Sequence, residues 1–134
     1  MNKTLHLDIY TPTGKYLTSD VDFIKVTSSI AVLGILPGHA PLVTTLEICH
    51  LTLKRNGEEF NYAISGGILN IKKDRSVVML LNAIEKSDEI DFDRANESKI
   101  RAEERLNAQK EDIDVARAKA ALSRALNRLS LQDK

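Results

Sequence analysis

Residues 90–95, Ile-Asp-Phe-Asp-Arg-Ala, return as Ile-Asp-Val-Ala-Arg-Ala at residues 113–118, and this repeat shapes the second half of the chain. Both copies continue in the pattern I-D-x-x-R-A-x5-R-A-x-x-R-L, at an offset of 23 residues. Arginines at i, i+7 and i+11 lie on one face of a helix. The repeat therefore predicts two helices that each carry a basic stripe, which is either a solvated face or a surface that binds a phosphate or an acidic partner. The six arginines are Arg94, Arg101 and Arg105 in the first copy and Arg117, Arg124 and Arg128 in the second.

The segment around this repeat is expected to fold as an antiparallel helical hairpin. Asp88 or Asp91 can cap the first helix, because a short carboxylate accepts hydrogen bonds from unpaired backbone N–H groups. Asp112 or Asp114 can cap the second helix in the same way, and residues 107–110 are the expected connection. On both helices the arginines are predicted to lie opposite an apolar stripe rich in alanine. Alanine buries little area, so this hairpin should open at a low cost in free energy.

The composition of the chain changes between residues 84 and 85. Every glycine and every proline lies at or before Gly67. From Glu85 onward the last 50 residues hold 12 acidic and 11 basic side chains. We therefore expect two domains, a first one over residues 1–84 and the helical hairpin over residues 85–134.

The first domain is predicted to consist of β-strands. Apolar and polar residues alternate from Leu5 to Ile9 and again over residues 51–53 and 60–64, as in half-buried strands. Asn56-Gly57 favours a hairpin turn, because both residues tolerate positive φ. Short strands at this spacing suggest a sandwich or a flattened barrel. The predicted fold class is α+β, with an N-terminal antiparallel β-sandwich followed by a C-terminal antiparallel two-helix hairpin.

A second constellation occupies residues 33–42, Leu-Gly-Ile-Leu-Pro-Gly-His-Ala-Pro-Leu. Two prolines and two glycines among aliphatic residues predict a rigid loop of defined shape. Such a loop is either a corner of the sandwich or a surface that presents apolar groups to a partner. The residues predicted to face a partner are Leu36, Pro37, Gly38 and His39.

The remaining features of the sequence exclude several classes of protein. The net charge is zero, so no global field recruits nucleic acid or anionic lipid. The histidines are dispersed, Cys49 is the single cysteine, and no glycine-rich phosphate loop is present. We therefore expect neither an enzyme active site nor a metal site.

The longest wholly apolar run, Val77–Leu81, is too short to span a bilayer, and no signal peptide is apparent. A cytoplasmic protein is expected, with membrane association only through a partner.

The loop at residues 33–42 and the helical hairpin together resemble the epsilon subunit of bacterial F-type ATP synthases. The resemblance covers the whole chain, from Thr11-Pro12-x-Gly14 through Ser65-Gly66-Gly67 to the closing Arg124-Ala125-Leu126-Asn127-Arg128-Leu129. It implies a ten-stranded β-sandwich followed by two helices. It also implies a non-catalytic subunit of the rotating central stalk in a proton- or sodium-translocating synthase, peripheral on the cytoplasmic face of the bacterial cell membrane.

The same resemblance implies the partners. They are the gamma subunit, the ring of c subunits and, when the hairpin extends along gamma, the catalytic alpha/beta ring, where the hairpin inhibits ATP hydrolysis. In the family, glycine and then an acid usually precede the Leu-Gly-Ile segment, and the acid touches the c ring. Here those two positions are Ala31 and Val32. The c-ring contact in this chain is therefore either apolar or carried by other residues, and the resemblance assigns no residue to it.

Some bacterial members of the family bind ATP between the two helices of the folded hairpin, as a regulatory ligand that is not hydrolysed. Their motif, I/L-D-x-x-R-A, is matched by residues 90–95. Arginines around a triphosphate make charge-assisted hydrogen bonds worth about 1.5–3 kcal/mol each. Without ATP, the like charges favour separation of the helices. Carried over position by position, the ATP-binding residues are Glu85, Asp91, Arg94, Arg101, Arg124 and Arg128.

Two alternatives stay open at this point. One is the same subunit with an inhibitory hairpin but without an ATP site. The other is a free-standing nucleic-acid-binding module that uses the arginine stripes. The zero net charge argues against this module, and so does the helical half, whose single aromatic residue is Phe92.

Overall fold

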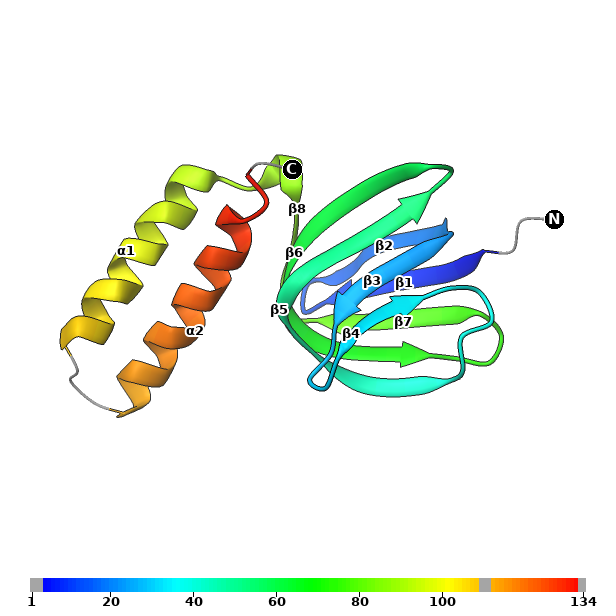
Figure 1. Cartoon of the computed structure of the whole chain (residues 1–134), viewed down its shortest axis with the longest axis horizontal. Coiled ribbons are helices and arrows are strands. Elements are labelled where there is room, and N and C mark those ends of the chain that lie inside the picture. The colour runs from blue at the N-terminus through cyan, green and yellow to red at the C-terminus, as the bar shows by residue number, and fades with distance from the viewer. Residues whose placement is uncertain (1–3, 109–111, 133–134) are drawn as a thin grey trace. The chain divides into compact units, whose positions relative to one another are not determined.

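The computed structural model describes residues 4–108 and 112–132 of the chain, which divides into two compact units (Figure 1). The first unit comprises residues 1–86 and the second residues 87–134. The boundary between the units lies two residues later than the boundary predicted from the composition. The reason is that Ile84–Lys86 form a further strand, β8, of the first unit.

The described part of the first unit contains eight strands. They follow one another across the sheet in the order β2-β1-β7-β6-β5-β3-β4, and β8 pairs with β6. Most of the pairings are antiparallel, and the parallel pair of β1 with β7 is the exception to the antiparallel sandwich that the sequence predicts. In chain order the strands are β1 (Leu5–Thr11), β2 (Gly14–Val21), β3 (Phe23–Thr27), β4 (Val32–Ile35), β5 (Leu42–Arg55), β6 (Glu58–Ile71), β7 (Ser76–Leu81) and β8 (Ile84–Lys86).

Strands β5 and β6 are long enough, at 14 residues each, to take part in both layers of the sandwich. Figure 1 shows both strands curving along their length. Their ladder is interrupted between the pairs Leu46–Gly67 and Ile48–Ser65. On one side of this interruption β6 pairs with β7, and on the other side it pairs with β8. The eight strands correspond to the ten that the resemblance implies once β5 and β6 are counted in both layers.

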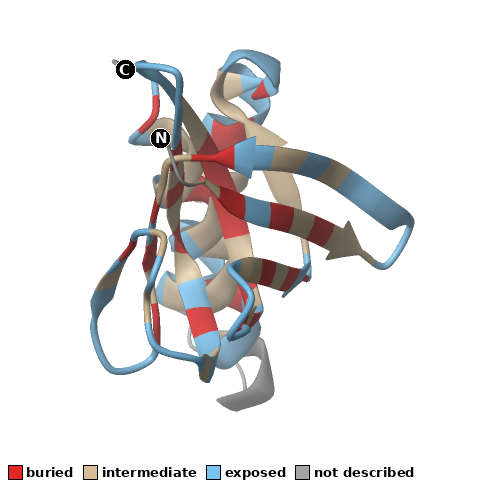
Figure 2. Cartoon of the chain, turned by 90° about the vertical axis from the view of Figure 1, so that its right-hand side faces the viewer, coloured by how far each residue is buried: buried red, intermediate tan, exposed pale blue. Residues whose placement is uncertain are grey.

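The core of the first unit lies between the layers and is formed by alternate residues of the strands. In β1, Leu5, Leu7 and Ile9 are buried, whereas the residues between them are exposed or half-buried. Figure 2 shows this alternation as bands of buried and exposed residues along the strands. The alternation predicted from the sequence is therefore confirmed. Other large and fully buried side chains include Ile24, Ile35, Leu51, Ile64, Leu69, Ile71 and Met79.

The second unit contains a short 3-10 turn (Ser87–Glu89) and the helices α1 (Phe92–Ala108) and α2 (Asp112–Leu129). The helices pack along each other in opposite directions, which confirms the predicted hairpin (Figure 1). Asp91 caps α1, because its Oδ1 accepts a hydrogen bond from the backbone N–H of Arg94 at 3.0 Å. Helix α1 continues to Ala108, so residues 107 and 108 are helical and not part of the connection as predicted. Residues 109–111 and the side chains of residues 108 and 112–114, with the predicted caps Asp112 and Asp114, lie outside the described part.

Two glycines occupy the centre of β6, where the strand bends. Gly66 and Gly67 both have positive φ, at 90° and 153°. A Cβ added to Gly67 would collide with the backbone oxygen of Leu80 in β7. The two strands can therefore approach each other only where residue 67 has no side chain.

Gly67→Ala is expected to destabilise the first unit by about 3 kcal/mol or more, because left-handed strain adds to a collision with a backbone atom. Urea unfolding followed by tyrosine fluorescence measures this loss, since the chain has three tyrosines, all within residues 1–86, and no tryptophan. Gly14→Ala is the matched control. There φ is 125° but nothing lies within 4 Å of the added Cβ. Only strain of about 1–2 kcal/mol should remain in the control, and equal losses in the two variants would contradict the steric argument.

Candidate functional site

Four buried alanines lie among the described side chains of the two helices. Ala95 and Ala102 of α1 and Ala118 and Ala125 of α2 are each at most 3% exposed. In each helix the two alanines are seven residues apart and therefore lie on one side of the helix, two turns apart. Because the helices are antiparallel, Ala95 lies at the level of Ala125 and Ala102 at the level of Ala118. We infer that these alanines form the seam, where the helix axes approach to about 8 Å, the short end of the usual range.

Each of these four alanines directly follows an arginine, and this fixes where the arginines lie. Successive residues of an α-helix are about 100° apart, so the arginines border the seam and do not lie opposite it. The placement predicted from the sequence is therefore wrong in this respect. The buried alanines lie at the centre of the seam, the half-buried Val115, Leu122 and Leu129 of α2 lie beside them, and Leu126 is 46% exposed.

Antiparallel packing brings both arginine stripes to the same face of the hairpin. A two-fold axis perpendicular to the plane of two antiparallel helices exchanges one helix with the other. A residue on the upper face of one helix is carried to the upper face of the other helix. The two sequence copies, 23 residues apart, carry arginine at equivalent positions. The axis therefore maps one stripe onto the other. We call the resulting surface the arginine face; it is formed by Arg94, Arg101, Arg105, Arg117, Arg124 and Arg128.

The arginine face gathers three of the predicted ATP-binding residues at one level of the hairpin. Arg94, in the first turn of α1, lies at the level of residue 126 of α2, between Arg124 and Arg128. Arg101 lies about 10 Å further along the helix axis. Arg94 and Arg101 are exposed, whereas Arg124 and Arg128 are half-buried.

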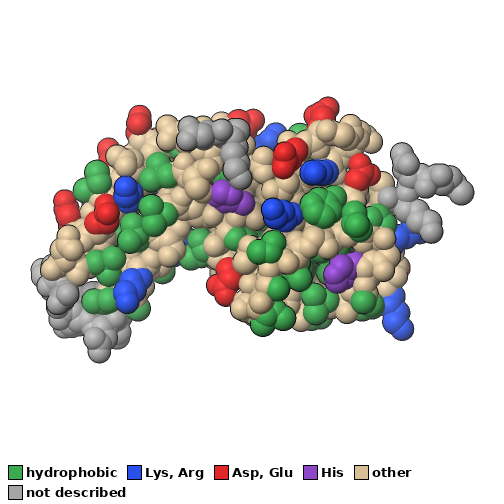
Figure 3. Space-filling model, in the orientation of Figure 1, with side chains coloured by type: hydrophobic (Ala, Val, Ile, Leu, Met, Phe, Trp, Pro, Cys, Tyr) green, Lys and Arg blue, Asp and Glu red, His purple; other side chains and the backbone are tan. Residues whose placement is uncertain are grey.

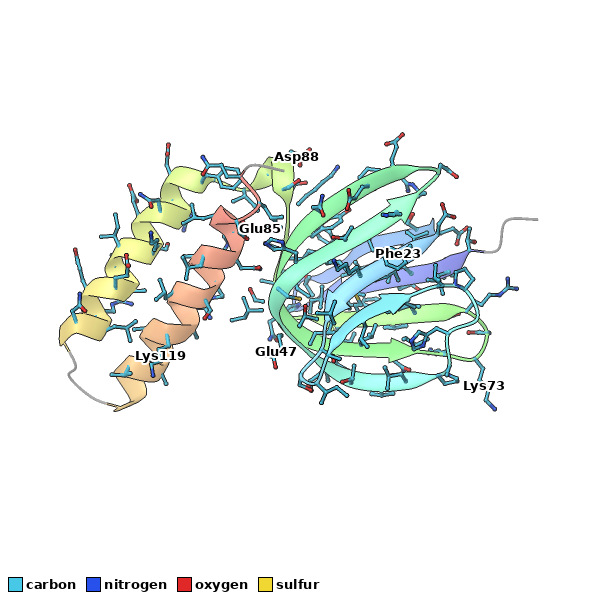
Figure 4. All side chains as sticks on the ribbon, in the orientation of Figure 1. Phe23, Glu47, Lys73, Glu85, Asp88 and Lys119 are labelled. Carbon is cyan, nitrogen blue, oxygen red and sulfur yellow. The ribbon has the colours of Figure 1, made fainter. Side chains whose placement is uncertain are left out.

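The two predicted acidic residues have different surroundings. Asp91 immediately precedes α1, where it caps the helix and lies within one turn of Arg94. Glu85 is half-buried in β8, opposite Ala63 of β6, and is labelled in Figure 4. Glu85 is therefore a residue of the sandwich and not of the hairpin.

The arginine face has little compensating negative charge among the described residues. Arg101 donates a hydrogen bond to the Oγ of Ser98 at 3.5 Å. The exposed Glu97 and Glu104 of α1 lie about half a turn round the helix from the alanines and so point away from the seam. Guanidinium groups gathered in this way suit a ligand with several oxyanions. No described carboxylate forms an ion pair with Arg94, Arg101, Arg105, Arg117 or Arg124.

The residues predicted to face a partner form a tight turn between β4 and β5. The backbone N–H of His39 donates to the carbonyl of Leu36 at 3.0 Å, and Gly38 has a φ of 97°. Pro37 followed by Gly38 suits the two central positions of such a turn. His39 also donates through Nδ1 to the carbonyl of Ala40 at 2.7 Å. These bonds hold the turn in one shape, with Leu36 exposed at its surface.

The described part of the sandwich exposes large apolar side chains in several places, two of which hold more than one of them. Ile30, which precedes β4, is 84% exposed, and Val32, the first residue of β4, is 61% exposed. On the outer side of the other layer, Leu80 pairs with both Tyr10 and Ile68 in a row across three strands, and Leu80 and Ile68 are exposed. Figure 3 shows hydrophobic side chains at the surface of both units. Apolar surface of this kind is typical of protein docking sites. Ile30 is not among the residues predicted from the sequence, although an isoleucine in a serine-rich turn is a signal for exposure.

The titratable groups with a shifted pKa include four residues of the first unit. Burial raises the pKa of the Cys49 thiol. The Asp20 carboxylate, which lies 2.9 Å from the imidazole Nδ1 of His6, raises the pKa of that exposed histidine. Hydrogen bonds from Thr18 and Ser76 lower the pKa of Asp8 and of Asp74, respectively. Among the described residues no group of three or more His, Cys, Asp or Glu side chains is placed to hold a metal ion.

No helix in the described ranges has both the length and the apolar character that crossing a bilayer requires.

The chain is similar over nearly its whole length to known proteins. Residues 4–86 match the family described as "ATP synthase, Delta/Epsilon chain, beta-sandwich domain", and residues 88–131 match "ATP synthase, Delta/Epsilon chain, long alpha-helix domain". Proteins named "ATP synthase epsilon chain" from Desulforamulus reducens and Bacillus licheniformis are each 43% identical over 129 residues, which cover 96% of this chain and 97% and 98% of theirs. In fold, the chain is similar to one in the cryo-EM structure of the Euglena gracilis mitochondrial ATP synthase, with a TM-score of 0.86, 20% identity, and coverage of 98% of this chain and 82% of that chain.

Ala118→Leu is expected to destabilise the hairpin by roughly 1–3 kcal/mol, because the larger side chain forces the helices apart at their closest approach. Thermal unfolding followed by circular dichroism at a helix-sensitive wavelength measures the change. Ala116→Leu is the matched control, since Ala116 is an exposed alanine of the same helix. The control should change stability by no more than about 0.5 kcal/mol, and an equal effect of both variants would contradict the alanine seam.

Proposed function

The chain belongs to the ATP synthase Delta/Epsilon chain family, and on this premise we propose that it is the epsilon subunit of a bacterial F-type ATP synthase. It is a non-catalytic part of the rotating central stalk, which couples proton or sodium-ion flow to ATP synthesis. Its partners hold it at the cytoplasmic face of the cell membrane. Its hairpin inhibits ATP hydrolysis when extended, and bound ATP holds the hairpin closed.

The sandwich is the part that docks on the rotor. Its two exposed apolar surfaces support this role, because covering apolar area contributes about 25 cal/mol per Å². The row around Leu80 and Ile68 suits the gamma subunit. The exposed Ile30 and Val32 at the start of β4, and the turn at residues 36–39 that follows its end, suit the c ring. In this chain the c-ring contact is apolar at Val32, where the family usually carries an acid.

The observation that carries the ATP site is the convergence of Arg94, Arg124 and Arg128 at one level of the arginine face. Their guanidinium groups can hold the phosphates by charge-assisted hydrogen bonds worth about 1.5–3 kcal/mol each. Arg101, two turns further along the same face, adds a fourth cation for an extended triphosphate.

The predicted acidic residues suit a different part of ATP from the part that the arginines suit. The carboxylates of Asp91 and Glu85 can only accept hydrogen bonds. They therefore suit the amino group of adenine or the ribose hydroxyls, and they do not suit the phosphates. In this proposal the nucleoside lies beside Asp91 and the phosphates lie along the arginines.

ATP acts in this proposal as a regulatory ligand that is not hydrolysed. The alanine seam contributes little apolar area, and the gathered arginines repel one another when no anion is bound. ATP offsets this repulsion, and it shifts the hairpin toward the closed form by as much as it binds that form more tightly. Without ATP, the hairpin extends along gamma toward the alpha/beta ring.

Isothermal titration of the full chain with ATP is expected to show saturable binding. Arg124→Ala should weaken this binding roughly 10- to 100-fold, because a group that makes charge-assisted hydrogen bonds of about 1.5–3 kcal/mol is removed. Lys119→Ala is the matched control and should leave the affinity within about twofold. Lys119, labelled in Figure 4, is an exposed cation of the same helix that follows Ala118 and so borders the seam from the other face.

Two outcomes of the titration would overturn parts of the proposal. The absence of heat at millimolar ATP would leave an inhibitory hairpin without an ATP site. A larger loss of affinity in Arg117→Ala than in Arg124→Ala would show that the two copies are assigned to the wrong roles.

ATP hydrolysis by a bacterial alpha/beta/gamma assembly provides a test of the inhibitory role. Adding the chain is expected to lower the hydrolysis rate at low ATP, and rising ATP should relieve the inhibition. With Arg124→Ala, a higher ATP concentration should be needed to relieve the inhibition. The increase should equal the factor by which the variant weakens ATP binding. If the chain left the rate unchanged at every ATP concentration, the inhibitory role would be refuted.

A further inference from the structure

We propose that the arginine face carries a second oxyanion site, formed by Arg101, Arg105 and Arg117 near the connection between the helices, which binds inorganic phosphate or short polyphosphate chains. The proposal rests on the packing of the hairpin and not on the binding of ATP.

The symmetry of the hairpin leads to this site. The two-fold axis that exchanges the helices carries each residue of the first copy onto the residue 23 positions later in the sequence. Arg94 is thereby exchanged with Arg117, and Arg101 with Arg124. The third exchange is that of Arg105 with Arg128. Each arginine that converges at the start of α1 thus has a counterpart near the other end of the hairpin.

The counterparts also converge. Arg117 of α2 lies at the level of residue 103 of α1, between Arg101 and Arg105, just as Arg94 lies between Arg124 and Arg128. The centres of the two groups are about nine residues apart along the helices, or roughly 13 Å at 1.5 Å per residue. This separation exceeds the Debye length of about 8 Å at physiological ionic strength. An anion in one group is therefore largely screened from an anion in the other.

The charges of the second group are uncompensated among the described residues. All three arginines are exposed, and no described carboxylate forms an ion pair with any of them. Glu103 of α1 borders the seam from the opposite face, because it directly follows Ala102. Three planar guanidinium groups on one face offer several pairs of parallel N–H donors, which match the oxygens of a phosphate.

Because the three arginines are exposed, the second site should bind phosphate weakly. Because water and salt screen the contacts, we expect a dissociation constant on the order of millimolar. A phosphate that contacts both helices binds the closed hairpin more tightly than the extended one. It therefore favours closure of the hairpin. Arg101 also belongs to the proposed nucleotide site, so an ATP molecule whose phosphates reach Arg101 competes with inorganic phosphate for that side chain.

The test uses the full chain and inorganic phosphate as the probe. The arginine Nε–H signals are followed in nitrogen–proton correlation spectra, at constant ionic strength with chloride as the balancing anion. The signals of Arg105 and Arg117 are expected to shift and to saturate in the millimolar range. Shifts that grow without saturation, or that chloride alone reproduces, would overturn the proposal.

Three variants separate the second site from other causes. Arg117→Gln should weaken phosphate binding roughly 5- to 100-fold at Arg105, since glutamine keeps helix propensity but loses the charge. Lys119→Gln removes a cation from the opposite face of the same helix and should leave the titration unchanged. Arg128→Gln disables the proposed nucleotide site, yet the shifts of Arg105 and Arg117 should persist. If they vanish in Arg128→Gln, phosphate binds only the first group and the second site does not exist.

Failure of this proposal is distinguishable from failure of the ATP site. The phosphate titration is read at Arg105 and Arg117, and the ATP titration responds to Arg124. A chain that binds phosphate but gives no heat with ATP would keep the second site and lose the nucleotide site. If the chain bound ATP but the signals of Arg105 and Arg117 did not shift with phosphate, the nucleotide site would be kept and the second site would be lost.

Discussion

The contact between alanines across the hairpin is the interaction on which the second unit depends. Ala95, Ala102, Ala118 and Ala125 are all buried, and side chains of this size let the helices approach closely. The close approach turns two separate basic stripes into one face, because each alanine is preceded by an arginine that borders the seam. The same small side chains contribute little apolar area. One residue type therefore explains both how a site for an anion is assembled and why the helices that form it separate easily.

The two units differ in what holds them together, and the difference matches their proposed roles. The sandwich has a core of large aliphatic side chains between two layers that share β5 and β6, so its opening requires the loss of extensive apolar burial. The hairpin has a seam of alanine and a face of like charges. Local opening is cheapest where apolar contacts are few. The chain thus combines a rigid part suited to docking with a part whose closure a bound anion can control.

The features that could be predicted from the sequence are those that local patterns determine. Asn56-Gly57 predicts a hairpin turn, and both residues have positive φ; the arginine spacing likewise predicts the two helices. The parallel pairing of β1 with β7 has no local signature, because the strands are distant in sequence. The position of the arginines relative to the seam was predicted wrongly. A helical wheel gives the large side chain of Leu126 more influence than the small one of Ala118, and only the packing shows which side of the helix its partner covers. Glu85 is a similar case, since a strand of three residues leaves no trace in composition.

The two-fold relation between the helices has a further consequence for how such a hairpin can be built. A tandem copy of one 23-residue unit is sufficient to generate it. When both copies are helical and fold back on each other, each buried alanine of the unit meets a buried alanine of its copy, and each of the three arginines is placed twice on the same side. A single ancestral helix that paired with itself as a homodimer would present the same surface. The covalent hairpin then differs from that dimer mainly in its loop, which leaves the two ends of the face free to diverge in sequence and in the ligand that each one holds.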